Sequence, residues 1–194
     1  HPLLDTLLLS LLGYLVGSIS TAVLVAKLFG FIDPRQAGSH NAGATNVLRL
    51  GGRWAGLLTL LGDILKGALP PAICLITGKP LHAIAAAGIG AVIGHLLPLY
   101  FNFQGGKGVA TGIGVIAVWN WPTCVVLITV WLATAAITRY SSLASMLAFL
   151  AAAIYACLLT PLWAEPVLAI TALILYKHRP NLQNLKEGKE PRLG

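Results

Sequence analysis

The residues best suited to chemistry in this chain form a polar cluster at positions 38–49, which reads GSHNAGATNVLR. Its glycines allow close approach of the backbone to a ligand, and its Ser, Asn and Thr side chains offer neutral hydrogen bonds. Arg49 ends the cluster with a planar guanidinium that suits a phosphate group. The simpler alternative is a hydrogen-bonded loop in which Ser39 or Asn41 caps the next helix.

A second cluster, Gly105-Gly106-Lys107-Gly108, directly precedes an apolar run. Glycines can turn their N–H groups toward an anion, the N-terminus of a helix adds partial positive charge, and Lys107 supplies a full charge. The cluster is not a nucleotide P-loop, because the GxxxxGK spacing is absent and Gly108 stands where Ser or Thr would bind magnesium. It predicts an anion cradle, with a plain turn and a snorkelling lysine as the alternative.

A third cluster contains His178 and Asn181. Imidazole exchanges protons near neutral pH, so His178 is a candidate for proton transfer. The alternative is a basic tail that only contacts anionic lipid headgroups. Ser142 follows Arg139 at the end of another apolar run, where it either caps a helix or joins a site.

Two charges lie inside an apolar run. Asp63 and Lys66 are three positions apart, so they share a helix face, and charges within a membrane are usually paired or functional. They form either a mutual pair, or an arrangement in which Lys66 lines an anion pocket and Asp63 orients it. His95 fits a core histidine at least as well as a ligand. Glu187 and Glu190 are predicted to be solvated tail charges.

Several classes of site are excluded. No GxSxG elbow and no H-x4-D signature is present, and no cysteine lies in a polar cluster. The six Asp and Glu residues do not cluster, so a two-metal site lacks ligands, and no metal or cofactor is expected. Cys74, Cys124 and Cys157 lie in apolar segments without CxxC spacing and are predicted to be inert packing residues.

The composition is that of a membrane protein. Hydrophobic residues make up 57% of the 194 residues and charged residues only 10%, whereas soluble domains carry about 25% charged residues. Lipid must therefore be the main solvent. The length leaves no room for a separate soluble domain, so residues 1–194 are expected to form one polytopic domain. The net charge of +7 does not indicate nucleic-acid binding, because the basic residues lie in loops and form no continuous stripe.

Seven apolar runs predict an all-α integral membrane protein with seven transmembrane helices. The runs are 3–28, 54–77, 82–102, 109–119, 122–138, 142–160 and 162–176. The first lacks an A-x-A-like cleavage site and is expected to be a retained span. The pairs Gly13/Gly17, Gly90/Gly94 and Gly108/Gly112 have GxxxG spacing and predict close helix packing.

The basic residues predict the orientation. With the N-terminus outside, 11 of the 13 lysines and arginines fall on the inside, leaving Lys66 in a span and Lys79 outside. All three polar clusters and the C-terminus then lie on the cytoplasmic side, which predicts an active site at that face. Trp119, Trp121 and Trp163 near outer turns, and Trp54 near an inner turn, are expected interface anchors.

The motifs together resemble a known family, that of the bacterial acyl-phosphate:glycerol-3-phosphate acyltransferases (the PlsY family). The resemblance runs in order over nearly the whole chain. It is carried by Gly17-Ser18, by Gly38-Ser39-x-Asn41-x-Gly43-Ala44-Thr45-Asn46, by Gly105-Gly106-Lys107-Gly108-Val109-Ala110-Thr111, by Ser142-Leu143 and by His178-Arg179-x-Asn181. One departure is Pro180, which stands between His178 and Asn181 and can shift where that helix ends.

The resemblance implies an enzyme of the bacterial inner membrane, with seven spans and an outside N-terminus. It implies transfer of an acyl group from acyl phosphate, and not from acyl-CoA, to the 1-hydroxyl of glycerol 3-phosphate. The products are lysophosphatidate and inorganic phosphate, in phospholipid synthesis. Because an acyl phosphate is a mixed anhydride with a good leaving group, direct transfer without an acyl-enzyme is expected.

Within this resemblance we expect the following roles. Glycerol 3-phosphate is assigned to Ser39, Arg49, Lys107, His178 and Asn181. The acyl-phosphate head is assigned to Gly105, Gly106, Lys107, Gly108, Thr111 and Ser142. The catalytic residues are then His178, Lys107, Asn181 and Ser142. Secondary or loop-shaping roles go to Asn41, Thr45, Asn46, Lys66 and Asp63.

Alternatives remain open at this point. The proton acceptor is either His178 or the phosphate of the donor itself. A transporter for a phosphorylated metabolite would suit a basic, glycine-rich vestibule, but it predicts polar residues on the outer side, where the turns have almost none. An acyl-CoA-dependent acyltransferase would fit the same phosphate cradle. A lipid-binding assembly factor is disfavoured by the many neutral polar residues in two loops.

Overall fold

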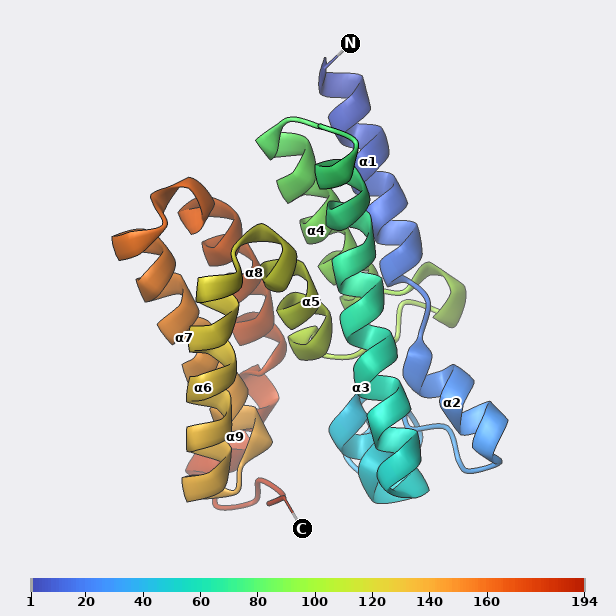
Figure 1. Cartoon of the computed structure of the whole chain (residues 1–194). Helices are drawn as coiled ribbons and strands as arrows, with labels where there is room; N and C mark the ends of the chain where they lie inside the picture. The colour runs from blue at the N-terminus through green and yellow to red at the C-terminus, as the bar shows by residue number, and fades with distance from the viewer. Residues whose placement is uncertain (1, 194) are drawn as a thin grey trace. The chain divides into compact units, whose positions relative to one another are not determined.

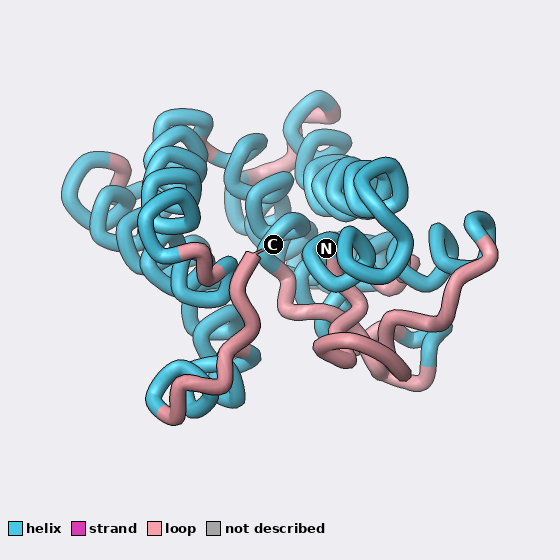
Figure 2. The backbone as a smooth tube through the Cα atoms, turned by 90° about the horizontal axis from the view of Figure 1, so that it is seen from below, coloured by secondary structure: helices cyan, strands magenta, loops and turns pink. Residues whose placement is uncertain are grey.

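The computed structural model describes residues 2–193, and every regular element within them is helical (Figures 1 and 2). Internal contacts divide the chain after Trp119 into two compact units, which are described separately. The first unit contains α1 (Pro2–Gly17), α2 (Thr21–Phe29), α3 (Ala44–Ile76), α4 (Leu81–Leu96), η1 (Leu99–Phe101) and α5 (Val109–Trp119). The second contains α6 (Trp121–Thr138), α7 (Ser141–Leu159), η2 (Pro161–Trp163), α8 (Ala164–Lys177) and α9 (Arg179–Lys186).

Five segments of residues 2–193 are long and apolar enough to cross a membrane. They are Pro2–Phe29, Ala44–Ile76, Leu81–Phe101, Trp121–Thr138 and Ser141–Leu159. These correspond to five of the seven predicted runs. The other two runs form shorter helices, α5 with 11 residues and α8 with 14. The run at 109–119 forms a helix with these same bounds.

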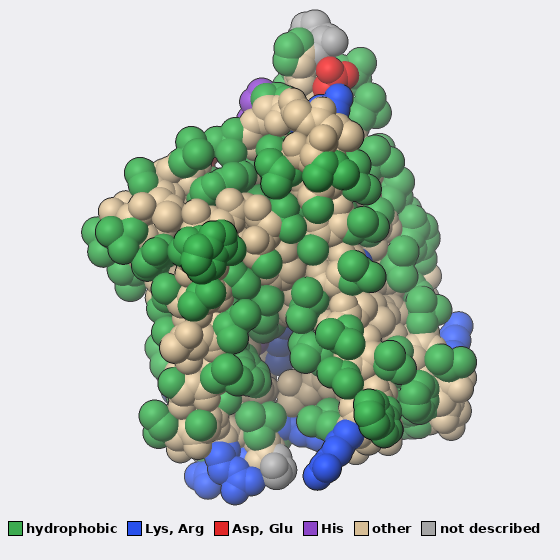
Figure 3. Space-filling model, in the orientation of Figure 1, with side chains coloured by type: hydrophobic (Ala, Val, Ile, Leu, Met, Phe, Trp, Pro, Cys, Tyr) green, Lys and Arg blue, Asp and Glu red, His purple; other side chains and the backbone are tan. Residues whose placement is uncertain are grey.

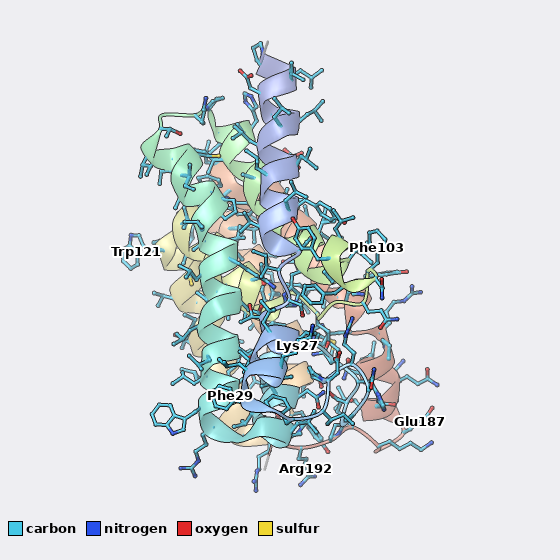
Figure 4. The ribbon with its side chains drawn as sticks, turned by 90° about the vertical axis from the view of Figure 1, so that its right-hand side faces the viewer. Lys27, Phe29, Phe103, Trp121, Glu187 and Arg192 are labelled. Carbon is cyan, nitrogen blue, oxygen red and sulfur yellow. The ribbon has the colours of Figure 1, made fainter. Side chains whose placement is uncertain are left out.

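The first predicted run is not one continuous helix. It breaks between α1 and α2, at Ser18–Ser20, and this corrects the expectation for residues 3–28. A break frees backbone carbonyls that lipid cannot satisfy. Lys66 of α3 satisfies one of them, since its Nζ donates to the Ile19 carbonyl at 2.7 Å. In Figure 4, Lys27 and Phe29 project from the short helix α2 that follows the break.

Glycines set the packing of α1 on α4, as two of the three GxxxG pairs predicted. A Cβ at Gly13 would collide with the backbone oxygen of Ala87, and one at Gly94 with that of Tyr14. The two helices therefore approach backbone to backbone. The third pair is a correction, because Gly108 lies before α5, with φ of +86°, and is not helical.

The long helix α3 packs against α5 by the same principle, through glycines that had not been singled out. A Cβ at Gly67 would strike the backbone oxygen of Thr111, and one at Gly114 that of Ile64. These contacts fix the start of α5, and hence the glycine-rich loop before it, against the middle of α3. The other end of α3 is kinked at Gly52, which has φ of +83°.

The second unit packs α7 against α6 and α8. Its interior holds Phe149 of α7 and Ile170 and Ile174 of α8, which are fully buried. The Thr171 hydroxyl donates to the Phe149 carbonyl at 3.2 Å, so this buried hydroxyl is satisfied inside the unit. His178 directly follows the C-terminal end of α8 and is buried.

The surface is predominantly apolar. Hydrophobic side chains are spread over the face seen in Figure 3, as expected for helices that face lipid. Trp54 and Trp121 are exposed, as anchors at the interface should be, and Trp121 points away from its helix in Figure 4. Trp119 is a correction, since it is buried and its Nε1 donates to the Ile84 carbonyl at 3.3 Å. Cys157 is another, because it is exposed and does not pack.

Candidate active site

The first polar cluster folds around the side chain of Asn46, which is buried in the first turn of α3. Its Nδ2 donates to the carbonyls of Pro34 at 2.8 Å, Ala37 at 3.0 Å and Asn41 at 3.2 Å. Its Oδ1 accepts the Ser39 backbone N–H at 2.9 Å. One amide thus binds four backbone groups of the loop between α2 and α3, which gives the loop a defined shape without regular structure.

The polar side chains around Asn46 do not cap α3. The N-cap residue is Gly43, and it makes no side-chain hydrogen bond, so the capping alternative for Ser39 and Asn41 is wrong. Ser39 is exposed, and Asn41 and Thr45 are half-buried. Arg49 is exposed on the second turn of α3. This leaves a hydroxyl and a guanidinium at the surface beside a loop that is held from within.

A charged pair ties this loop to the next one. The guanidinium of Arg35 binds the Asp33 carboxylate at 2.6 Å, and its Nη1 donates to the Phe101 carbonyl of η1 at 3.0 Å. The hydrogen bond from Arg35 lowers the pKa of Asp33 below its ordinary value. The loop before α3 and the turn before the glycine-rich loop are therefore joined by one side chain. Neither Asp33 nor Arg35 had been predicted as a site residue.

The glycine-rich loop Gly105–Gly108 enters α5 and lies directly against the first loop. The Gly106 N–H donates to the His95 carbonyl at 3.2 Å. A Cβ at Gly106 would lie 2.7 Å from the Ala42 carbonyl oxygen and would collide with His95 Nε2. Only glycine fits this gap between the two loops. Gly108 has φ of +86°, which side-chain-bearing residues rarely adopt, and it redirects the chain into the N-terminus of α5.

Lys107 is half-buried within this loop, and Thr111 is buried in the first turn of α5. The first unit thus brings two predicted clusters together, one from each loop. The N-terminus of α5 and the glycines before it offer N–H groups that suit an anion. This agreement between distant parts of the sequence comes from the packing of α5 and α4 against α3.

Beneath the glycine-rich loop lies the charged pair of α3. Lys66 Nζ is 2.8 Å from Asp63 Oδ1, so the predicted mutual pair is present. His95 Nδ1 lies 3.6 Å from the same carboxylate oxygen. Asp63, Lys66 and His95 are all buried. The Lys66 ammonium contacts the Asp63 carboxylate and the Ile19 carbonyl, and both partners lie inside the protein.

In the second unit, Ser142 and Asn181 meet on one carboxylate. Ser142 Oγ donates to Glu190 Oε1 at 2.5 Å, and Asn181 Nδ2 donates to the same oxygen at 2.8 Å. All three side chains are buried. Glu190 was predicted to be a solvated tail charge, and this is wrong, because the tail folds back and buries it. Glu187, by contrast, is exposed and points outward in Figure 4.

His178 lies between α8 and α9 and is buried. Its Nδ1 is 2.8 Å from the Ile174 carbonyl, and because a carbonyl only accepts, Nδ1 carries the proton. In the neutral ring the lone pair is then on Nε2. Pro180 does not disturb this arrangement, because it lies in the first turn of α9, where its missing N–H costs no hydrogen bond.

The sequence did not assign Arg35 or Glu190 to these clusters, and it left His95 open between a core histidine and a ligand. Arg35 stood two positions from Asp33, which was a usable signal for a local pair. Glu190 gave no signal, because the return of the tail brings its partners to it, and the packing of α4 decides the partners of His95. The residues predicted from motifs fall into two groups, one in each unit.

Comparison with known proteins places these clusters in context. The family model for glycerol-3-phosphate acyltransferase matches residues 7–188. A glycerol-3-phosphate acyltransferase of Halorhodospira halophila is 47% identical, over 99% of this chain and 98% of its own length. One of Pseudomonas putida strain GB-1 is 48% identical, over 94% of this chain and 97% of its own.

Solved structures point to the same family. The chain is similar to the crystal structure of PlsY (YgiH), an integral membrane glycerol 3-phosphate acyltransferase, in its glycerol 3-phosphate form, with a TM-score of 0.91 and 37% identity. That match covers 97% of this chain and 96% of the other. The lysophosphatidic acid form of PlsY gives a TM-score of 0.90 and 36% identity. With the family model matching most of its length, the chain belongs to the PlsY family of glycerol-3-phosphate acyltransferases, and it is a multi-pass membrane acyltransferase.

Proposed function

We propose that this acyltransferase uses acyl phosphate as its donor and acylates the 1-hydroxyl of glycerol 3-phosphate. The hydroxyl oxygen attacks the acyl carbon, the bond from that carbon to the phosphate oxygen breaks, and inorganic phosphate leaves. The product is lysophosphatidate. The glycerol 3-phosphate and lysophosphatidic acid forms of the similar PlsY structures support this choice of acceptor and product.

The observation that carries the proposal is the contact of the two loops at Gly106. It brings the glycine-rich loop, Lys107 and the N-terminus of α5 next to the loop that holds Ser39. Two substrates with phosphate groups need such a concentration of N–H donors and positive charge. In this proposal Gly105–Gly108 and Thr111 bind the acyl-phosphate head, and Lys107 contacts both phosphates.

The remaining residues of the first unit bind the acceptor. Arg49 offers a bidentate fork to the phosphate of glycerol 3-phosphate, and Ser39 offers a hydroxyl. Asn46 holds the loop, with Asn41 and Thr45 beside it. Holding both substrates in a reactive geometry supplies much of the rate enhancement in a direct transfer.

The proposal assigns proton transfer to His178, and orientation of the substrates to Asn181 and Ser142. His178 Nε2 takes the proton from the acceptor hydroxyl, a role supported by the Nδ1 hydrogen bond, which places the lone pair of the neutral ring on Nε2. Asn181 contacts the acceptor and Ser142 the donor, both oriented by Glu190. The alternative acceptor of the proton is the phosphate of the donor.

The membrane arrangement belongs to the same proposal. α5 and α8 join the five long segments to give seven spans, with the N-terminus outside and the active site at the cytoplasmic face of the inner membrane. The charge bias of the loops supports this orientation. Both substrates would then reach the active site from the cytoplasm.

One alternative concerns the donor. An acyl-CoA also presents phosphate groups, so a phosphate cradle does not by itself select between an acyl phosphate and a thioester. A transporter is no longer a candidate, because the family is one of acyltransferases.

The test is an assay of the purified enzyme in lipid or detergent with glycerol 3-phosphate and either palmitoyl phosphate or palmitoyl-CoA. We expect equal amounts of lysophosphatidate and inorganic phosphate from palmitoyl phosphate, and no product from palmitoyl-CoA. The Lys107→Ala and Arg49→Ala variants should lose most of this activity. Turnover with palmitoyl-CoA alone would overturn the donor and keep the acyl transfer.

A further inference from the structure

The glycine-rich loop rests on a buried charged network that no catalytic role explains. Asp63 and Lys66 lie in the middle of α3, within a segment long enough to cross the membrane. Burying a charge in such a segment is energetically unfavourable, so charges found there usually have a structural or functional role. A mutual pair alone would need no third member, yet His95 Nδ1 of α4 lies 3.6 Å from Asp63 Oδ1.

His95 contacts the loop at two points. Its carbonyl oxygen accepts the Gly106 N–H at 3.2 Å. Its ring presents Nε2 to the Cα of Gly106, so close that a Cβ there would collide with it. On the other side of Gly106 lies the Ala42 carbonyl of the first loop. Gly106 is thus held between the His95 ring and the first loop, one residue before Lys107.

The carboxylate is placed to orient the ring. At 3.6 Å the contact between Asp63 and His95 is longer than a hydrogen bond, but in a buried environment a charge at this distance acts strongly on an imidazole. Lys66 binds the same carboxylate oxygen at 2.8 Å, and it also binds the break between α1 and α2 through the Ile19 carbonyl. The network therefore links α3, α4 and the break between α1 and α2.

We propose that Asp63 and His95 are positioning residues for the glycine-rich loop: the carboxylate orients the imidazole, and the imidazole fixes Gly106 and so the placement of Lys107. The inference rests on the proposed function, in which this loop binds the phosphate groups. Neither residue needs to touch a substrate. The network acts on substrate affinity through the loop, as supporting shells of binding sites do.

The test is steady-state kinetics of the whole enzyme with the His95→Gln variant, which keeps a polar side chain but removes the ring. We expect the KM for at least one phosphate substrate to rise about tenfold, with a smaller change in kcat, because a displaced loop weakens binding. His82→Gln is the matched control, an exposed histidine at the start of the same helix. It should leave both constants unchanged.

A double-mutant cycle separates positioning from mere stability. If His95 acts through Asp63, the KM effect of His95→Gln should largely vanish in an Asp63→Asn background. Additive effects on KM, or a lower thermal midpoint with KM unchanged, would overturn the inference. Should His95→Gln fail to fold, Asp63→Glu carries the same test, because it keeps the charge balance with Lys66 and displaces the carboxylate.

Lys107→Ala distinguishes this inference from the function on which it rests. If Lys107→Ala leaves both KM values unchanged, the loop does not bind the phosphates and the proposed function fails. If Lys107→Ala raises KM while His95→Gln and Asp63→Glu do not, only the positioning role is overturned.

Discussion

Glu190 joins two side chains that the sequence had placed in different roles. Ser142 and Asn181 both donate to its Oε1, and the three groups are buried together. A carboxylate with two donors on one oxygen makes strong, charge-assisted hydrogen bonds. It fixes the rotamers of both partners, which is what a residue that contacts a substrate requires.

Removing this carboxylate should be costly. In Glu190→Ala two buried donors lose their acceptor, at about 1–3 kcal/mol for each unsatisfied group. We expect a lower thermal midpoint and a large loss of kcat, with partial recovery in Glu190→Gln, which keeps one acceptor oxygen. Thermal unfolding and steady-state assays would measure both. Glu187→Ala, at an exposed carboxylate three residues away, is the control and should behave as wild type.

The proposed role of His178 as a general base predicts how activity depends on pH. As a general base it must be neutral, so wild-type activity should fall at acidic pH, where the ring becomes protonated. His178→Ala should lower kcat by about 10²- to 10⁴-fold and remove this acidic limb. A pH–rate profile of both proteins is the measurement. An acidic limb that persists in His178→Ala would assign the proton to the donor phosphate instead.

At the scale of elements, the loops of the first unit are held by polar contacts rather than by regular structure. Asn46 gathers the loop before α3, and Arg35 fastens it to the turn at Phe101. Glycine packing brings α5 to the middle of α3 and carries the second loop with it. The positions of the two loops therefore depend on the packing of the helices to which they are attached.

The pair of Asp33 and Arg35 predicts a pH-dependent stability. Because the pKa of Asp33 is lowered in the folded protein, its contribution is full above the ordinary aspartate pKa of about 3.9 and is lost as the pH falls through the lowered value. Asp33→Asn should therefore destabilise the protein at neutral pH, by on the order of 1 kcal/mol or less. The difference from wild type should shrink below about pH 4.

Thermal unfolding in detergent between neutral and acidic pH measures this difference. The control is Asp5→Asn, which changes an exposed carboxylate on α1. A stability difference that stays constant at low pH would mean that the carboxylate charge does not hold the two loops together.

At the scale of the whole molecule, the orientation in the membrane is testable by labelling. Single cysteines would be placed at Ser39, Lys79 and Arg192, all exposed, in a background with the three native cysteines replaced. A membrane-impermeant thiol reagent should label the Lys79→Cys variant in intact cells, because Lys79 is predicted to lie outside. Ser39→Cys and Arg192→Cys should react only after permeabilisation. The reverse pattern would invert the orientation.

The sequence by itself determined the class of the protein, the limits of most helices and the polar clusters, because these follow from local composition and spacing. A low charge content requires a lipid environment, and motifs of glycine, amide and basic residues can be recognised wherever they lie. The break at Ser18–Ser20 was missed, since its cost is met by Lys66, 47 residues away from Ile19.

Only the tertiary structure decided which side chains support the clusters. Glu190 reads as an ordinary tail charge until the tail folds back onto Ser142, 48 residues earlier in the chain. His95 reads as a core histidine until α4 packs it against Asp63 and Gly106. A buried polar group forms its hydrogen bonds with the partners that tertiary packing places next to it. Spacing along the sequence does not identify these partners.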